Sequence, residues 1–289
     1  MQRITYKYQS PNGIGPGNTA QLKMSTGSKY HDLQLVTNMD LADILEIRVQ
    51  ADNKVIHRYS ATERDIKNRH YKPELAFTKV NGKGVVFIPF DRLVQNSRLM
   101  EEMTALQVGW PYANGEIIRN LTLEVDIAEG AVNPTLDVWV TTSAVTDGYD
   151  GRVMHEVKHT RSAAGAGELQ IADLPYNAPT AQAINDVFFI ARNPNPVDPQ
   201  VPEPVVINSA KVERDQYKVV ERTDGLNRFM LKAGERNPQA DVFTIDWTEK
   251  GYGGNALDLR RVQDFRYTLD MAAAAQITVL SSYIGTKGE

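Results

Sequence analysis

The five residues from His155 to His159 read His-Glu-Val-Lys-His and match the H-E-x-x-H pattern of zinc peptidases. On a helix, the two imidazoles at positions i and i+4 would bind one Zn²⁺ ion, and Glu156 would act as general base for the water on the metal. This chemistry requires the stretch to be helical.

The surrounding sequence argues against a helix at this motif. Gly148 and Gly151 lie just before it, and Gly165 and Gly167 lie just after it, so a long active-site helix has no room. The neighbouring apolar residues form no helical stripe, and no histidine follows His159 to act as a third ligand. We therefore expect a polar strand or loop here and predict no catalytic, cofactor-binding or metal-binding residue.

Other catalytic arrangements lack their sequence signals. The chain has no Gly-x-Ser-x-Gly elbow. None of the histidines has an evident serine partner in a strand–turn–helix context; they are His31, His57, His70, His155 and His159. We expect a protein that is not an enzyme.

Composition narrows the remaining classes. The 289 residues carry a formal net charge of −4 and a pI of about 5.8, which argues against a surface that neutralises phosphates. No cysteine is present, so disulfides and thiolate metal sites are excluded. No apolar run approaches the roughly 18 residues of a membrane span, and the first residues contain no signal-peptide core. The default expectation is a cytoplasmic product.

The first 31 residues are unusually basic. They contain Arg3, Lys7, Lys23 and Lys29 and no acidic residue. One interpretation is a first strand with solvated lysines, and the other is an N-terminal arm that faces an anionic surface.

The clearest pattern is a hairpin that the chain contains twice, at 120–143 and at 264–285. In both copies, apolar residues alternate strictly with polar ones, which predicts strands with one buried face. The alternating residues are Leu121, Leu123, Val125 and Ile127 in the first copy and Phe265, Tyr267, Leu269 and Met271 in the second.

Two shorter echoes support a duplication. Residues 48–52 resemble 211–215, and residues 86–90 resemble 242–246. With the hairpin, the three echoes keep the same order, and their offset shrinks from 163 to 156 to 144, as expected if the second copy has shorter loops. The sequence therefore predicts two related halves.

Short strands and a few helices are expected between the hairpins. The predicted strands are 20–24, 31–37, 44–50, 75–80, 84–90, 152–158, 168–174, 186–192, 204–207, 210–221 and 241–247. A capping box formed by Ser60 and Glu63 predicts a helix at 61–69. Further helices are expected at 93–106 and 255–263. The Pro-rich stretch 193–204 is interpreted as a projecting loop.

Two halves that each contain many short strands predict an all-β chain of two antiparallel sandwiches, for which the eight-stranded jelly roll is a common solution. We place the first domain at 1–146 and the second at 147–289, with a Gly-rich crossing after Asp147.

Three stretches carry a resemblance to a known family. They are Glu168 to Pro175, Met103 to Ala128, and Leu257 to Ile284. The chain resembles the major capsid proteins of tailless, membrane-containing icosahedral phages, most closely the corticovirus type. The resemblance implies a double jelly roll, with two tandem eight-stranded antiparallel jelly rolls and a few short helices.

The resemblance also implies a function and partners. Three chains would form a pseudo-hexagonal homotrimer that tiles a virion shell over an internal membrane, after synthesis in the host cytoplasm. Expected partners are neighbouring capsomers, penton and minor capsid proteins, with contact to the membrane through the basic residues 1–31. No cofactor and no direct nucleic acid binding are expected.

The alternative is a carbohydrate-binding jelly-roll module, because one fold can serve either use. Such a module should present an aromatic platform in its loops, for which the candidates are Trp110, Tyr112, Tyr149 and Tyr252.

Overall fold

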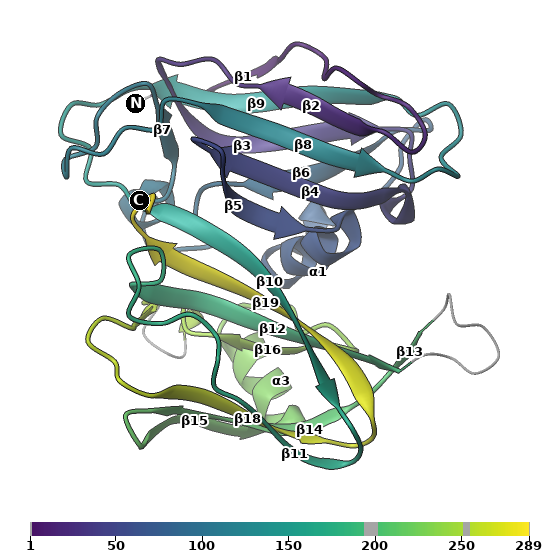
Figure 1. The fold of residues 1–289 in the computed structure, drawn as a ribbon, viewed down its shortest axis with the longest axis vertical. Helices are drawn as coiled ribbons and strands as arrows, with labels where there is room; N and C mark the ends of the chain where they lie inside the picture. Colours follow the sequence, from purple (N-terminus) through teal and green to yellow (C-terminus); the bar gives the residue numbers. More distant parts are fainter. Residues whose placement is uncertain (1, 194–201, 251–254, 289) are drawn as a thin grey trace. The chain divides into compact units, whose positions relative to one another are not determined.

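The computed structural model describes residues 2–193, 202–250 and 255–288 and is built mainly of β-strands (Figure 1). The chain divides into two compact units. Unit 1 consists of Met1–Glu156 with Thr286–Glu289, and unit 2 consists of Val157–Gly285. Most of the predicted Pro-rich loop, residues 194–201, lies outside the described residues.

Unit 1 is a sandwich of two antiparallel sheets. One sheet has the order β1-β9-β3-β6, with β7 also paired to β3, and the other has the order β2-β8-β4-β5. The strands are β1 (Ile4–Lys7), β2 (Thr19–Lys23), β3 (Ser28–Thr37), β4 (Ile44–Ala51), β5 (Lys54–Tyr59), β6 (Gly84–Pro89), β7 (Leu106–Val108), β8 (Leu121–Ile127) and β9 (Leu136–Ala144). The predicted strand at 75–80 is wrong, because only Val80 pairs there, in a single bridge to Lys83.

Unit 2 repeats this arrangement. One set of strands has the order β13-β12-β19-β10, with β16 and β17 also paired to β12, and the other sheet has the order β11-β18-β14-β15. The strands are β10 (Val153–Ala163), which begins in unit 1, β11 (Gly167–Ile171), β12 (Ala183–Asn193), β13 (Glu203–Pro204), β14 (Ile207–Arg214), β15 (Tyr217–Thr223), β16 (Phe243–Asp246), β17 (Leu257–Asp258), β18 (Phe265–Met271) and β19 (Ala275–Gly285).

The strand orders match one to one. β1-β9-β3-β6 corresponds to β10-β19-β12-β16, and β2-β8-β4-β5 corresponds to β11-β18-β14-β15. The three sequence echoes fall on β4 and β14, on β6 and β16, and on the consecutive strands β8, β9 and β18, β19. The prediction that 120–143 and 264–285 are hairpins is wrong, because in each half the two strands lie in opposite sheets and do not pair with each other. The predicted duplication is confirmed, and each half is an eight-stranded jelly roll with added short strands.

The irregularities of the strands are duplicated as well. β3 changes register around His31, and β12 does so around Asn185. β4 shifts against β8 and β5, and β14 shifts at the corresponding positions against β18 and β15. Since a bulge re-aims side chains and bends its strand, its retention in both halves marks a requirement of the fold.

The turn between β4 and β5 has the same hydrogen bonds as the turn between β14 and β15. Asp52 and Asp215 both have left-handed backbone, with φ of 49° and 50°. Asp52 Oδ1 accepts from the amides of Arg119 and Asn120, each at 2.8 Å. Asp215 Oδ1 accepts in the same way from the two residues before β18, at 2.7 and 3.0 Å. In each half one carboxylate ties this turn to the residues just before β8 or β18.

Each unit has its own apolar core. The inward residues of β8 and β18 are the predicted alternating sets, and all eight are buried. Aromatic rings strengthen the second core, where Tyr267 lies 5.4 Å from Phe189 and 5.1 Å from Phe265 between ring centroids, in edge-on arrangements.

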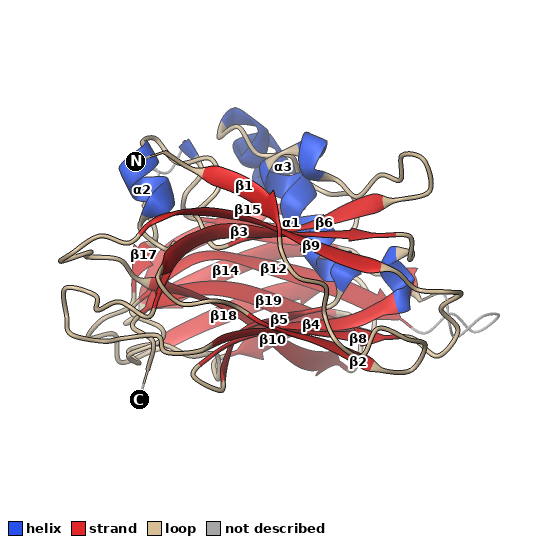
Figure 2. Cartoon of the chain, turned by 90° about the horizontal axis from the view of Figure 1, so that it is seen from above, coloured by secondary structure: helices blue, strands red, loops and turns tan. Residues whose placement is uncertain are grey.

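In the described parts of the chain, three short α-helices accompany the strands (Figure 2). They are α1 (Ala61–Tyr71), α2 (Arg98–Glu102) and α3 (Asp224–Ala233). The capping box of α1 is present as predicted, with Ser60 Oγ accepting from the Glu63 amide at 3.2 Å and Glu63 accepting from the Ser60 amide at 2.7 Å. Within the described part of the chain, no helix is long and apolar enough to cross a membrane.

The helix predicted at 93–106 is wrong except at its centre. Val94 has a φ of 55°, which no helix accommodates, and Leu106 belongs to β7, paired with Tyr30. The helix predicted at 255–263 is also wrong, because Leu257 pairs with β12 and Arg261 has a φ of 62°.

The sequence prediction also missed α3 and joined β14 and β15 into one strand at 210–221. In the structure the two strands form a hairpin that turns at Asp215 and Gln216.

Replacing Asp52 by alanine should reduce the free energy of unfolding by about 1–3 kcal/mol, because two backbone amides and Lys287 Nζ, 2.8 Å from Oδ2, lose their acceptor. Asp52→Asn should cost less, because its amide oxygen can still accept from the two backbone amides and asparagine tolerates left-handed backbone. Urea unfolding of both variants, with exposed Glu129→Ala as control, measures this difference. Equal losses for Ala and Asn would contradict the role of the backbone bonds.

Candidate functional site

The H-E-x-x-H motif lies on a strand. Because β10 spans Val153–Ala163 and a strand rises about 3.3 Å per residue, His155 and His159 are about 13 Å apart and cannot share a zinc ion. His155 is buried and its Nε2 donates to the Thr286 carbonyl oxygen at 2.8 Å. Among the described residues, no group of three His, Asp or Glu side chains is placed to hold a metal ion.

Glu156 is the centre of a buried ion cluster. Its two carboxylate oxygens lie 3.2 Å from Arg64 Nη1 and 2.6 Å from Lys67 Nζ, and all three side chains are almost completely buried. Burial opposes the charge of Glu156, but the charges of Lys67 and Arg64 outweigh it and hold its pKa below the ordinary value. Glu156 therefore stays ionised as the partner of two cations and is not a general base.

His57 lies beside this cluster as a neutral group. Complete burial lowers its pKa to about 3, and the attraction of Glu156 does not compensate for the loss of hydration. His57 Nδ1 lies 3.2 Å from the Tyr59 hydroxyl, and its ring packs 5.4 Å from that of Phe90. The histidine is part of the core of unit 1.

Unit 2 contains buried ion pairs of its own. Arg222 Nη2 lies 2.7 Å from Glu249 Oε1, and Arg236 Nε lies 2.6 Å from Asp246 Oδ2. Arg236 also donates to the carbonyl oxygen of Thr248 at 2.9 Å. Buried charges that are paired and hydrogen-bonded fix one arrangement of their strands and loops, because a mispaired charge would be costly.

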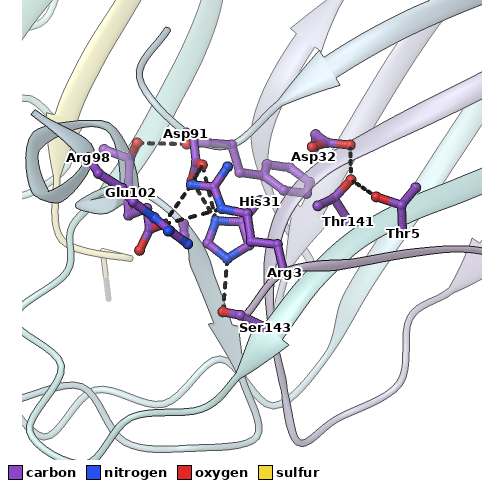
Figure 3. Close-up of polar contacts among 12 residues, drawn as sticks. Arg3, Thr5, His31, Asp32, Asp91, Arg98, Glu102, Thr141 and Ser143 are labelled. Carbon is purple, nitrogen blue, oxygen red and sulfur yellow. Dashed lines mark hydrogen bonds and ion pairs between the residues drawn. The ribbon is translucent and has the colours of Figure 1, made fainter. Parts of the chain in front are cut away.

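A second polar cluster in unit 1 contains a serine, a histidine and an aspartate in contact (Figure 3). His31 Nδ1 lies 3.0 Å from Asp91 Oδ2, and His31 Nε2 lies 2.9 Å from Ser143 Oγ. The sequence prediction found no serine partner for His31, because the three residues come from β3, the end of β6 and β9. Only the folded chain brings them together.

The aspartate, histidine and serine of this cluster are hydrogen-bonded in the same sequence as in a catalytic triad. The backbone conformation and exposure of the serine are different. In hydrolases the serine sits on a sharp turn that exposes Oγ, whereas Ser143 lies within β9, paired with Lys29 of β3, and is buried. The adjacent cavity of about 200 Å³ is lined by His31 and Asp91, and Ser143 is not among its described lining residues. By its described lining the cavity opens onto the histidine and the aspartate of the cluster.

The same cluster holds the N-terminal strand in place (Figure 3). Arg3 Nη2 lies 2.8 Å from both Asp91 Oδ2 and Glu102 Oε1, and Glu102 also accepts from Arg98 Nε at 2.5 Å. Partial burial opposes the charge of Glu102, but hydrogen bonds from Arg98 and Arg3 outweigh it and lower its pKa to about 2. One arginine therefore joins β1 to the end of β6 and to α2.

The basic N-terminal residues belong to the fold and do not form a separate arm. Lys7 pairs with Asp137 at 3.0 Å. Lys29 is buried, 3.1 Å from Thr146 Oγ1, with its ammonium 4.0 Å from the centre of the Tyr149 ring. Lys7 on β1 and Lys23 on β2 are both exposed, and Arg3 is partly buried.

The candidate aromatic platform is not a flat surface in unit 1. Tyr112 is buried, its ring lies 5.6 Å from that of Tyr149, and its hydroxyl accepts from the Gln107 amide at 2.9 Å. Trp110 is partly exposed and donates to Asp147 at 2.7 Å. Tyr252 lies outside the described residues.

Three solved structures that share this fold are capsid proteins. The major capsid protein P2 from bacteriophage PM2 is 20% identical and has a TM-score of 0.81 over 98% of this chain and 97% of that chain. The STIV major capsid protein, from Sulfolobus turreted icosahedral virus, is 10% identical and has a TM-score of 0.70 over 99% and 97%. The PBCV-1 virus capsid protein is 11% identical, with a TM-score of 0.63 over 98% and 93%. The chain therefore has the double jelly-roll fold of viral capsid proteins.

Models of protein families assign the chain to one particular family of capsid proteins. The viral coat protein P2 N-terminal domain matches residues 5–143, and the viral coat protein P2 C-terminal domain matches residues 154–287. The chain belongs to the viral coat protein P2 family. Among curated protein sequences, none matches.

The family and the structural matches confirm the resemblance to phage major capsid proteins, the double jelly-roll fold and the structural function. The protein is a capsid component whose place is the virion, and the carbohydrate-binding alternative is not supported. A family of viral coat proteins implies a structural role.

Replacing Glu156 by glutamine should reduce the free energy of unfolding by about 3–5 kcal/mol, because Arg64 and Lys67 lose the negative charge that they share. The control is Glu168→Gln, an exposed residue of β11, which should change stability by less than about 0.5 kcal/mol. Denaturant unfolding measures both. Equal stability of the two variants would contradict the central position of Glu156.

The pairing of Glu102 predicts a pH dependence. Because its pKa in the folded chain is about 2 against an ordinary value of 4.5, its contribution is complete above pH 4.5 and is lost as the pH falls toward 2. The contribution should be about 1 kcal/mol, since the pair is partly open to solvent. Unfolding free energies of Glu102→Gln should therefore fall less steeply than those of the wild type over this range. Parallel curves would contradict the prediction.

Proposed function

We propose that the protein is a major capsid subunit that forms pseudo-hexagonal homotrimers in an icosahedral shell over an internal membrane. The observation that carries this proposal is the duplication, because two jelly rolls of equal strand order occur in one chain. Three chains then supply six similar wall segments. Closed three-fold symmetry limits growth to one capsomer, and the capsomer becomes the unit of the lattice.

The proposed domains are residues 1–146 and 147–289, one jelly roll each. β9 ends at Ala144 and β10 begins at Val153, so the crossing falls between these strands. The geometric division places the first residues of β10 and the segment after Gly285 with unit 1.

We propose neighbouring capsomers, penton and minor capsid proteins as partners in the shell, and synthesis in the host cytoplasm. The net charge of −4 supports a shell that does not bind nucleic acid directly. Contact with the internal membrane through residues 1–31 is also proposed. Lys7 and Lys23 are the exposed ones of their basic side chains, and Lys7 is paired with Asp137, so we propose Lys23 as the contact to a lipid headgroup.

We further propose that the protein has no enzymatic role. The support is the geometry of its two candidate sites. Glu156 is bound to two buried cations, and Ser143 is buried within a strand.

Size-exclusion chromatography with light scattering tests the capsomer. The purified chain should have a mass of about 97 kDa, three times its 32.3 kDa. A chain that remains a 32.3 kDa monomer up to high concentration would contradict the proposal.

A further inference from the structure

α1 and α3 occupy the same place in the two jelly rolls, and the same hydrogen bond anchors them. Asn68 Nδ2 donates to the Phe87 carbonyl oxygen of β6 at 2.9 Å, and Asn227 Nδ2 donates to the Thr244 carbonyl oxygen of β16 at 2.8 Å. Both asparagines also accept from a buried arginine, at 3.0 and 3.2 Å. Asn68 and Asn227 are therefore equivalent positions.

The face next to this anchor differs sharply between the two helices. One residue before and two residues after the asparagine, α1 carries Lys67 and His70, which are 1% and 0% exposed. The equivalent residues of α3 are Leu226 and Phe229, which are 48% and 67% exposed. This face of α1 is therefore polar and buried, whereas the equivalent face of α3 is apolar and exposed.

The apolar surface continues beside α3. A cavity of about 100 Å³ is lined by Val206, Arg228 and Val242 among others, and Val206 is itself 58% exposed. Arg228 does not project into solvent as a free cation, because Asp224 and the carbonyl oxygens of Gln239 and Ala240 bind it. Apolar residues with few free charges are typical of the centre of a protein interface.

We propose that the face formed by Leu226 and Phe229 binds a second copy of this chain. The proposal rests on the proposed capsomer and names one of the surfaces that closes it. In a ring of six jelly rolls from three chains, equivalent helices have equivalent surroundings. The face that is covered on α1 must then be covered on α3 by a neighbouring subunit, and apolar side chains suit a contact that forms between chains.

The first experiment replaces both side chains. Leu226→Ser with Phe229→Ser should raise the dissociation constant of the oligomer at least tenfold, measured by light scattering across a dilution series. The matched control is Leu99→Ser on α2, which removes an apolar side chain that is 82% exposed and should leave association unchanged. Circular dichroism and the thermal midpoint should be the same for both variants as monomers, since the replaced side chains lie outside the core.

The possible outcomes distinguish a failure of the proposed α3 contact from a failure of the proposed trimeric capsomer. A wild type that never associates overturns both. A wild type that forms trimers, with the α3 variant forming them equally well, overturns the inference and leaves the capsomer in place. Weaker binding to anionic lipid vesicles with unchanged association would assign the face to a membrane and also overturn the inference.

A second measurement covers the case in which the double variant does not fold. The chain has no cysteine, so Phe229→Cys introduces the only thiol. Its reaction with a maleimide should be at least tenfold slower in the oligomer than after dilution to monomers, whereas Leu99→Cys should react equally fast in both. Equal rates for the thiol at position 229 would overturn the proposal.

Discussion

Every strand of both jelly rolls depends on the burial of one face of its sheet. In β8 and β18 each second side chain enters a core, so a slip of one residue would move the whole apolar set into solvent. The register is therefore set by the core and kept by the turns. The carboxylates of Asp52 and Asp215, which tie the β4–β5 and β14–β15 turns to the starts of β8 and β18, fix the same register in both halves.

The buried polar clusters follow from this constraint. Because of the register shifts in β3 and β12, His31 is not paired with a residue of β9 and Asn185 is not paired with a residue of β19. Both side chains are buried. A buried polar group must be hydrogen-bonded, so His31 contacts Asp91 and Ser143, and Asn185 donates to Asp186 at 2.9 Å. The resulting serine–histidine–aspartate contact fixes the position of a bulge. The hydrogen bonds of the cluster resemble those of a catalytic triad. Such an arrangement is catalytic only if a substrate can also reach the serine.

Local signals predicted much of the fold. Alternation identified β8, β9, β18 and β19, and the Ser60–Glu63 box identified α1, because each signal acts within a few residues. The prediction of secondary structure failed where contacts between residues far apart in the sequence determine the local conformation. The apolar run before Leu106 looks helical, yet pairing with Tyr30 makes its end a strand, and Gly225 concealed the start of α3. The cluster around His31 joins residues up to 112 positions apart, so no sequence pattern indicates it.

The fixed position of the segment after β19 bears on how the chain is made. Lys287 binds Asp52 and the Ile117 carbonyl oxygen, and Thr286 accepts from His155, so residues of unit 1 acquire partners that follow unit 2 in the sequence. A ribosome adds residues in order, and the last contacts of the first jelly roll can form only after the second has been translated. A nascent chain that has emerged as far as β9 therefore has an Asp52 turn bonded to the amides of Arg119 and Asn120 but still without its ion pair to Lys287. Maturation of the earlier half thus waits for completion of the later one.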